Sequence, residues 1–205
     1  MSALQPRAAL PAALRSRLWR ATEQAAQPAR SSGHATLDAV LPGGGWPLGA
    51  VSEILHPGPG HGELSLCLPA LAALAREGRA IGCVAAPARP YAPGLVQAGL
   101  PLSQLVCVEA PDTGLALWSA EQLLRAEVGG LLLWADRVEA AALRRLQLAA
   151  EEASSLVFLL REGQAHREAS TAALRLWLER RAEGLQLQVL KCRGAVPRGG
   201  LRLSA

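Results

Sequence analysis

The sequence predicts an α/β fold: a mostly parallel sheet flanked by helices, with an antiparallel hairpin at its C-terminal edge and a further helix at its N-terminus. First, short apolar runs alternate with longer segments of helical periodicity. Second, these runs are nearly continuous, which is typical of strands buried on both faces of a parallel sheet. Third, half of the 205 residues are apolar, enough for one well-buried core.

The alternating elements begin after a Gly/Pro turn that holds Trp46, which we expect to cover a sheet edge. Gly78 is a suitable stop for the first long helix. The expected strands are Val51–Leu55, Ile81–Ala86, Leu105–Glu109, Leu131–Ala135 and Leu156–Leu160. The expected helices are Leu64–Glu77, a short one around Pro93–Ala98, Leu115–Glu127, Glu139–Ala153 and Ser170–Arg181.

The last of these helices rests on three apolar residues at helical spacing, Leu174, Trp177 and Leu178, after a Ser-Thr pair that can cap it. Trp177 is therefore expected in the core, as are Trp118 and Trp134. The strands Leu185–Lys191 and Leu201–Leu203 have only the turn-rich stretch CRGAVPRGG between them, so they are expected to form the antiparallel edge hairpin.

The N-terminal residues 1–30 form a basic region apart from the expected core at 31–205. Within them an amphipathic helix is predicted, and Gln27–Ala35 is expected to be a linker. The helix either folds back on the chain's own core or docks on a partner. The residues that would bind such a partner are Leu14, Arg15, Arg17, Leu18 and Trp19.

The charge is uneven although the net value is only +4. Residues 1–30 hold five arginines and one glutamate, and residues 191–205 hold four basic residues and no acid, so the middle is acidic. Basic ends favour contact with a polyanion or an acidic partner, unless they are only solvated termini.

A soluble cytoplasmic protein is expected, because no apolar run approaches the roughly 20 residues that cross a bilayer. The four cysteines lack metal-site spacing and are expected to be reduced core residues.

The stretch LHPGPGHGELSL stands where a phosphate-binding loop would stand, between an apolar strand and a helix. Gly58, Gly60 and Gly62 give the backbone freedom that such a loop needs. The lysine and the hydroxyl residue of the motif G-x-x-x-x-G-K-[ST] are replaced by Glu63 and Leu64, however, and the glycine spacing differs. A carboxylate repels a triphosphate and a leucine cannot hold Mg²⁺, so we expect neither a bound cofactor nor catalysis.

Asp136 ends the strand LLLWAD, the position of a metal-assisting aspartate in nucleotide-binding folds. With the lysine missing, a polar strand terminus or a helix N-cap is the favoured interpretation. The histidines lie in turn-like segments and suggest neither a catalytic triad nor a metal site. They are His34, His56, His61 and His166.

Two long stretches, residues 36–54 (TLDAVLPGGGWPLGAVSEI) and 110–136 (APDTGLALWSAEQLLRAEVGGLLLWAD), resemble the RecA recombinase core in order and spacing. The segments GHGELSLCLPALAALAREGR, APARPYAPGLVQAGL and LRRLQLAAEEA are similar to the ImuA family, RecA-like accessory proteins of bacterial inducible mutagenesis that are sometimes described as SulA-like. This resemblance runs from Leu14 onward.

The resemblance implies a RecA-like fold and a role in damage-induced translesion DNA synthesis, in the cytoplasm. The partners that it implies are ImuB, an error-prone replicative-type DNA polymerase and RecA. The chain departs from RecA at Glu63 and Leu64 and lacks the water-activating glutamate in AAPARPYAP. The DNA-binding loop shrinks to about REGQAHREA, so DNA contact is expected to be weak or indirect.

Four functions follow as hypotheses. The first is a non-catalytic adaptor that acts through protein contacts. The second is an ATP-binding or ATP-hydrolysing repair protein, and a SulA-like division inhibitor is a further alternative. A single-stranded DNA binder is less favoured, because only 3% of residues are aromatic and stacking platforms need exposed rings.

Overall fold

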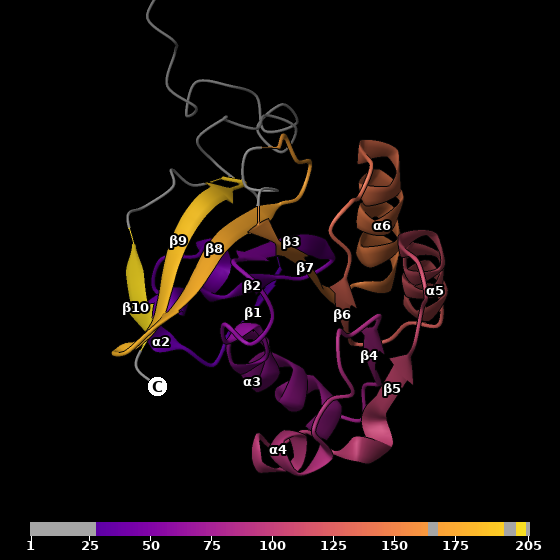
Figure 1. The fold of residues 1–205 in the computed structure, drawn as a ribbon, viewed down its shortest axis with the longest axis horizontal. Coiled ribbons are helices and arrows are strands. Elements are labelled where there is room, and N and C mark those ends of the chain that lie inside the picture. Colours follow the sequence, from indigo (N-terminus) through magenta and orange to yellow (C-terminus); the bar gives the residue numbers. More distant parts are fainter. Residues whose placement is uncertain (1–27, 164–167, 195–199, 204–205) are drawn as a thin grey trace, which may run out of the picture.

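The computed structural model describes residues 28–163, 168–194 and 200–203. Within these residues, eight strands form one sheet in the order β10-β9-β8-β3-β7-β6-β4-β5, and two more, β1 and β2, form a separate antiparallel pair. The strands of the large sheet from β8 to β5 run parallel, whereas β9 and β10 run antiparallel at the other edge (Figure 1). The predicted fold class is confirmed.

Most element bounds fall within a few residues of the sequence prediction. The strands of the large sheet are β3 (Ala50–His56), β4 (Ile81–Val84), β5 (Leu105–Val108), β6 (Gly130–Trp134), β7 (Leu156–Glu162), β8 (Leu174–Arg181), β9 (Gly184–Cys192) and β10 (Leu201–Leu203). The helices are α2 (Ala35–Asp38), α3 (Glu63–Arg76), α4 (Ala92–Gln97), α5 (Thr113–Arg125) and α6 (Ala140–Ala153). The small pair joins β1 (Ala29–Arg30) to β2 (Trp46–Pro47), and short 3₁₀ turns lie at Pro42–Gly44 and Leu102–Gln104.

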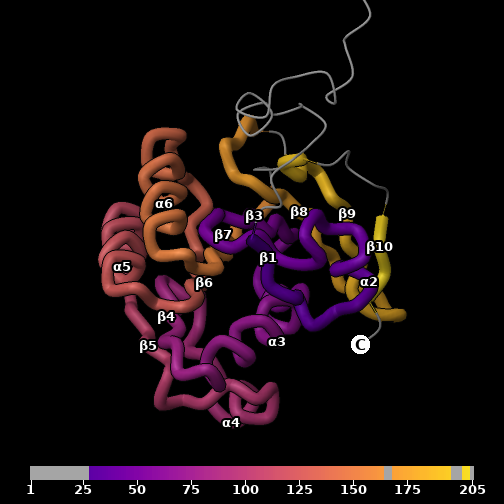
Figure 2. The backbone as a smooth tube through the Cα atoms, turned by 180° about the vertical axis from the view of Figure 1, so that it is seen from behind, coloured from indigo at the N-terminus to yellow at the C-terminus, as the bar shows by residue number. Residues whose placement is uncertain are grey.

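Helices cover the sheet on both faces, as Figures 1 and 2 show from opposite sides. One core holds the apolar side of α3 and inward residues of β3, β7, β8 and β9, around the edge-to-face pair of Trp46 and Phe158. The other holds α5 and α6 against β6 and β7. Because α3 and α4 lie on one face and α5 and α6 on the other, the chain crosses between faces beside β4, which places a crevice at the carboxyl ends of these strands.

The predicted helix over 170–181 is wrong, because these residues form β8, which pairs with β3 on one side and β9 on the other. Every second residue of this segment belongs to the core that contains α3: Leu174, Leu176 and Leu178. The apolar period is therefore two, as in a strand, rather than 3.6. Trp177 lies on the opposite face, partly exposed, and donates its indole N–H to Glu179.

Three further expectations need correction. Trp118 is 59% exposed on α5 rather than buried. Trp46 is fully buried against Phe158 of the inner strand β7 rather than at a sheet edge. Cys107 is exposed on the edge strand β5, next to Cys83 of β4, although Cys67 and Cys83 are buried as expected.

The region expected to be a linker contains β1, so the described chain is folded from its first residues. Arg30 forms an ion pair with Glu77 of α3, and Asp38 accepts hydrogen bonds from Ser31 and Ser32. The predicted N-terminal helix, with Leu14, Arg15, Arg17, Leu18 and Trp19, lies outside the described residues.

Candidate functional site

The loop between β3 and α3 has the position of a phosphate-binding loop, but its own side chains hold its shape. Gly58 O accepts from Nδ1 of His56 at 2.8 Å and from Nδ1 of His61 at 2.7 Å. A carbonyl oxygen only accepts, so each imidazole carries its proton on Nδ1 for these bonds. Pro57 and Pro59 have no backbone N–H to offer an anion.

Glu63 stands where an anion would bind. Its Oε1 accepts the backbone N–H of Gly60 at 2.8 Å, and only 5% of the residue is exposed at the first turn of α3. The positive end of a helix and free loop N–H groups favour an anion, and here the chain supplies its own carboxylate. A phosphate would have to displace that carboxylate and then face its charge.

The loop is also packed tightly against the antiparallel side of the sheet. A Cβ atom added to Gly62 would lie 2.3 Å from Cδ2 of Leu185 in β9, and Gly62 has a φ of +101° that other residues rarely adopt. The side chain of Leu64 packs against the α3 core and offers no oxygen to a metal ion. The loop is therefore packed closely against β9 at Gly62 and supplies no metal ligand at Leu64.

Asp136 lies just after β6 and holds two strand ends together. Its Oδ1 accepts the backbone N–H of Glu162, at the end of β7, at 2.7 Å. The strand-terminus interpretation fits this contact. The helix N-cap interpretation does not, because Glu139 is the N-cap of α6.

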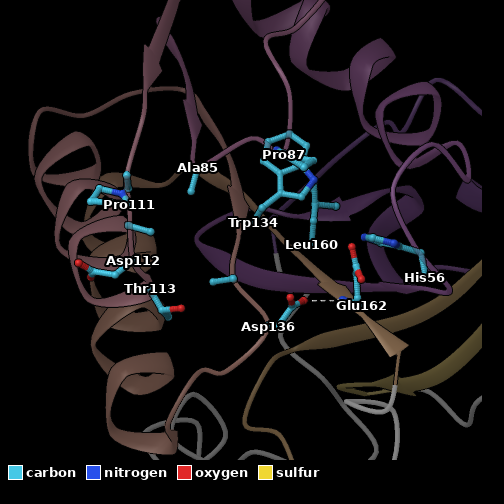
Figure 3. Close-up of a pocket in the computed structure, with 13 residues that line it drawn as sticks. His56, Ala85, Pro87, Pro111, Asp112, Thr113, Trp134, Asp136, Leu160 and Glu162 are labelled. Atoms are coloured by element: carbon cyan, nitrogen blue, oxygen red, sulfur yellow. Dashed lines mark hydrogen bonds between the residues drawn. The ribbon is translucent and has the colours of Figure 1, made fainter.

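A cavity of about 260 Å³ opens at the carboxyl ends of the strands, in the crevice beside the loop. Figure 3 shows His56, Glu162 and Asp136 toward one end of it and Asp112 and Thr113 toward the other, with Trp134 between them. The described residues around it include three carboxylates, of Asp112, Asp136 and Glu162, and no lysine or arginine.

Two buried polar atoms at this cavity have no hydrogen-bond partner among the described residues: Nε2 of His56 and Nε1 of Trp134. His56 is completely buried. Because Nδ1 of His56 donates to Gly58 O, Nε2 of the neutral ring is a bare acceptor. Asp112 uses Oδ1 to cap α5 by accepting the N–H of Leu115.

A buried network of ion pairs and hydrogen bonds connects β3, β7 and β8 near the cavity. Glu53 of β3 is fully buried and accepts from Nε of Arg175 at 2.5 Å, from Nη1 of Arg161 at 3.5 Å and from the Ser170 hydroxyl at 2.8 Å. Arg161 also donates to Asp136 O, at 3.0 Å from Nε, and to Glu168 at 2.9 Å.

The network extends to Lys191 of β9, whose Nζ donates to Ser170 O at 2.7 Å. Burial, with the neighbouring charges of Arg193 and Arg175, lowers the pKa of Lys191, while Glu53 acts in the other direction. The network thus contains three basic side chains and two acidic ones. Through the bond from Arg161 to Asp136 O it also holds the backbone of Asp136 at the cavity.

Sequence reasoning missed this network. The signal that could have revealed it is the lone acid in the buried strand AVSEILH, because a carboxylate inside a sheet requires cationic or hydrogen-bonding partners. Sequence reasoning also did not predict that His56 lines the cavity. No group of three or more possible metal ligands is present among the residues that the structure describes. In the same residues, no helix is both long and apolar enough to span a bilayer.

The fold and this site define an α/β protein whose candidate binding region lies at the carboxyl ends of a parallel sheet. No protein-family model matches the chain. It is 34% identical over 131 residues to Protein ImuA of Caulobacter vibrioides, in strain NA1000 / CB15N and in strain ATCC 19089 / CIP 103742 / CB 15 alike. The match covers 61% of this chain and 54% of each relative, so the chain spans about half the length of the relatives.

Proposed function

We propose that the chain is a non-catalytic accessory protein of damage-induced translesion DNA synthesis, and that it acts through protein contacts. The observation that carries this proposal is the Glu63 carboxylate on the Gly60 N–H, in the place of a bound phosphate. The similarity to Protein ImuA supplies the biological setting. The partners proposed from the family resemblance are ImuB, an error-prone replicative-type polymerase and RecA.

Catalysis of ATP hydrolysis needs three groups at such a site: a cation on the phosphates, a metal ligand and a base for water. Glu63 and Leu64 replace the first two. Around the cavity the end of β4 carries Ala85 and Pro87, and neither can activate water. Asp136, the candidate metal-assisting aspartate, is present, but one of its oxygens is engaged by a backbone N–H.

Two assays on the full chain test this proposal. In the first, phosphate release from Mg·ATP is compared with a no-protein control; no release is expected. The double variant Glu63→Lys, Leu64→Thr is expected to stay inactive, because the base is still absent. Release that disappears in Asp136→Asn would overturn the proposal.

In the second assay the purified chain is incubated with each proposed partner, with and without nucleotide. Association that does not depend on nucleotide is expected with at least one of ImuB, the polymerase and RecA. Association with none of the three would contradict an adaptor role. Association only with ATP present would point to a nucleotide-gated protein instead.

A further inference from the structure

We propose that the cavity at the ends of β4, β6 and β7 is a binding site for the guanidinium group of an arginine side chain presented by a partner protein. This inference rests on the proposed function in one respect only, that the occupant is a protein. It assigns to that contact a place on the fold and a chemistry.

The charge of the cavity selects a cation. Three carboxylates surround it, and no lysine or arginine is among the described residues that line it. Arg161 lies behind Asp136, but its guanidinium is already paired with Glu53 and Glu168. An anionic occupant such as a phosphate would therefore meet uncompensated negative charge.

One of the two unpartnered atoms, Nε2 of His56, selects a hydrogen-bond donor, whereas the other, Nε1 of Trp134, is itself a donor and makes no such selection. Nε2 of His56 is buried and accepts only, as long as Nδ1 donates to Gly58 O. A buried acceptor without a donor is unfavourable, and a ligand N–H would relieve this cost. A cation with several N–H groups meets both requirements at once.

A metal ion fits these residues poorly, because no three of the described His, Cys, Asp and Glu side chains form a group that could ligate one. The acceptors come instead from separate elements: His56 from β3, Asp136 from the segment after β6, and Glu162 from β7. A guanidinium is planar and carries five N–H donors in a fixed fork, so it spans separated acceptors better than a compact ammonium does. Trp134 adds an aromatic ring, on which guanidinium groups stack favourably.

The test is an NMR titration of the full chain, following the indole N–H of Trp134, assigned with Trp134→Phe. The probe is a blocked Gly-Arg-Gly peptide, with matched peptides that carry citrulline or lysine in place of arginine. Saturable shifts are expected with arginine, weaker ones with lysine and none with the neutral citrulline. Equal responses to arginine and citrulline, or no saturable response to arginine, would overturn the site.

Variants then locate the contact. Asp136→Asn with Glu162→Gln is expected to weaken arginine binding about tenfold, as the loss of two partly exposed charges predicts. Glu109→Gln is the matched control, because Glu109 is exposed, pairs with Arg89 and does not line the cavity. If the control weakens binding as much as the double variant, the peptide binds by general attraction and the site is refuted.

The chain's own N-terminal arginines are the competing source. In the full-length variant Arg15→Gln, Arg17→Gln the affinity for the peptide is expected to be unchanged. A clear gain in affinity would show that an internal arginine occupies the cavity and would overturn the assignment to a partner. A parallel titration with Mg·ATP separates the two proposals: nucleotide binding would refute the adaptor function, whereas failure of the arginine peptide refutes only this inference.

Discussion

The loop before α3 and the cavity beside it lie at the same edge of the sheet, yet they differ in where their polar groups find partners. In the loop, Oε1 of the buried Glu63 accepts the Gly60 N–H and two imidazoles bind Gly58 O, although Oε2 of Glu63 has no partner among the described residues. In the cavity, the buried Nε2 of His56 and Nε1 of Trp134 have no partner among the described residues. The chain's own carboxylate thus occupies the loop N–H that a phosphate would need, whereas in the cavity the imidazole acceptor and the indole donor stay open.

The largest expected effect is on the free energy of unfolding and comes from the buried network around Glu53. Glu53→Gln leaves Arg161 and Arg175 without their buried carboxylate, and loss of one partner of a buried ion pair costs about 3–5 kcal/mol. The free energy of unfolding from urea titration should fall accordingly. Glu109→Gln, in an exposed pair, is the control and should change little. Equal effects of the two variants would show that the network does not support the strand ends.

The next largest effect tests how much the stability of the protein depends on packing of the loop against β9. Gly62→Ala should destabilise the protein by about 2 kcal/mol, because the new Cβ meets Leu185 and the φ of +101° is strained. Gly60→Ala is the matched variant: it has a similar φ of +82° but open space around it, so strain alone should cost about 1 kcal/mol. Identical losses would mean that the loop does not depend on its packing against β9.

Asp136→Asn should have a smaller effect on folding. The amide oxygen can still accept the Glu162 N–H, so the cost should be about 1 kcal/mol or less. Thermal unfolding should stay close to wild type, and partner pull-down should weaken less than in the double variant Asp136→Asn, Glu162→Gln. A variant that folds normally but loses every partner would place the main contact at Asp136 itself.

The smallest expected effect is on the pH dependence of stability. It comes from Lys191, one of the basic groups of the network. Because its pKa is lowered in the native protein, the unfolded chain binds more protons between that value and the ordinary 10.5. Stability should therefore rise with pH through this window, and Lys191→Met should remove the rise. Urea titrations at pH 8 and at higher pH would measure it. A wild-type stability that instead falls more steeply than that of the variant would contradict the assigned direction.

Much of the fold could be predicted from the sequence, since strands such as Ile81–Val84 and helices such as Glu63–Arg76 carry strong local patterns. The segment after Ser170 could not be placed so simply. Leu174 and Leu178 fit both a helix and a strand, and only pairing with β3 and β9, far away in the sequence, decides between them.

The same contrast holds for the candidate site. The loss of the phosphate-binding residues was visible at Glu63 and Leu64, because that motif is local. The cavity was not, since His56, Asp112 and Glu162 are separated by about 50 residues each and meet only when the parallel strands align. The burial of Trp46 against Phe158 is likewise a long-range contact.

The most direct test of the closed loop is equilibrium binding of Mg·ATP to the full chain, measured by calorimetry. No saturable heat is expected up to millimolar nucleotide, because Glu63 already holds the Gly60 N–H and its charge repels the phosphates. Saturable binding that weakens when Asp136 is changed to Asn would contradict the account, since it would show that the loop opens and that the site still accepts a nucleotide.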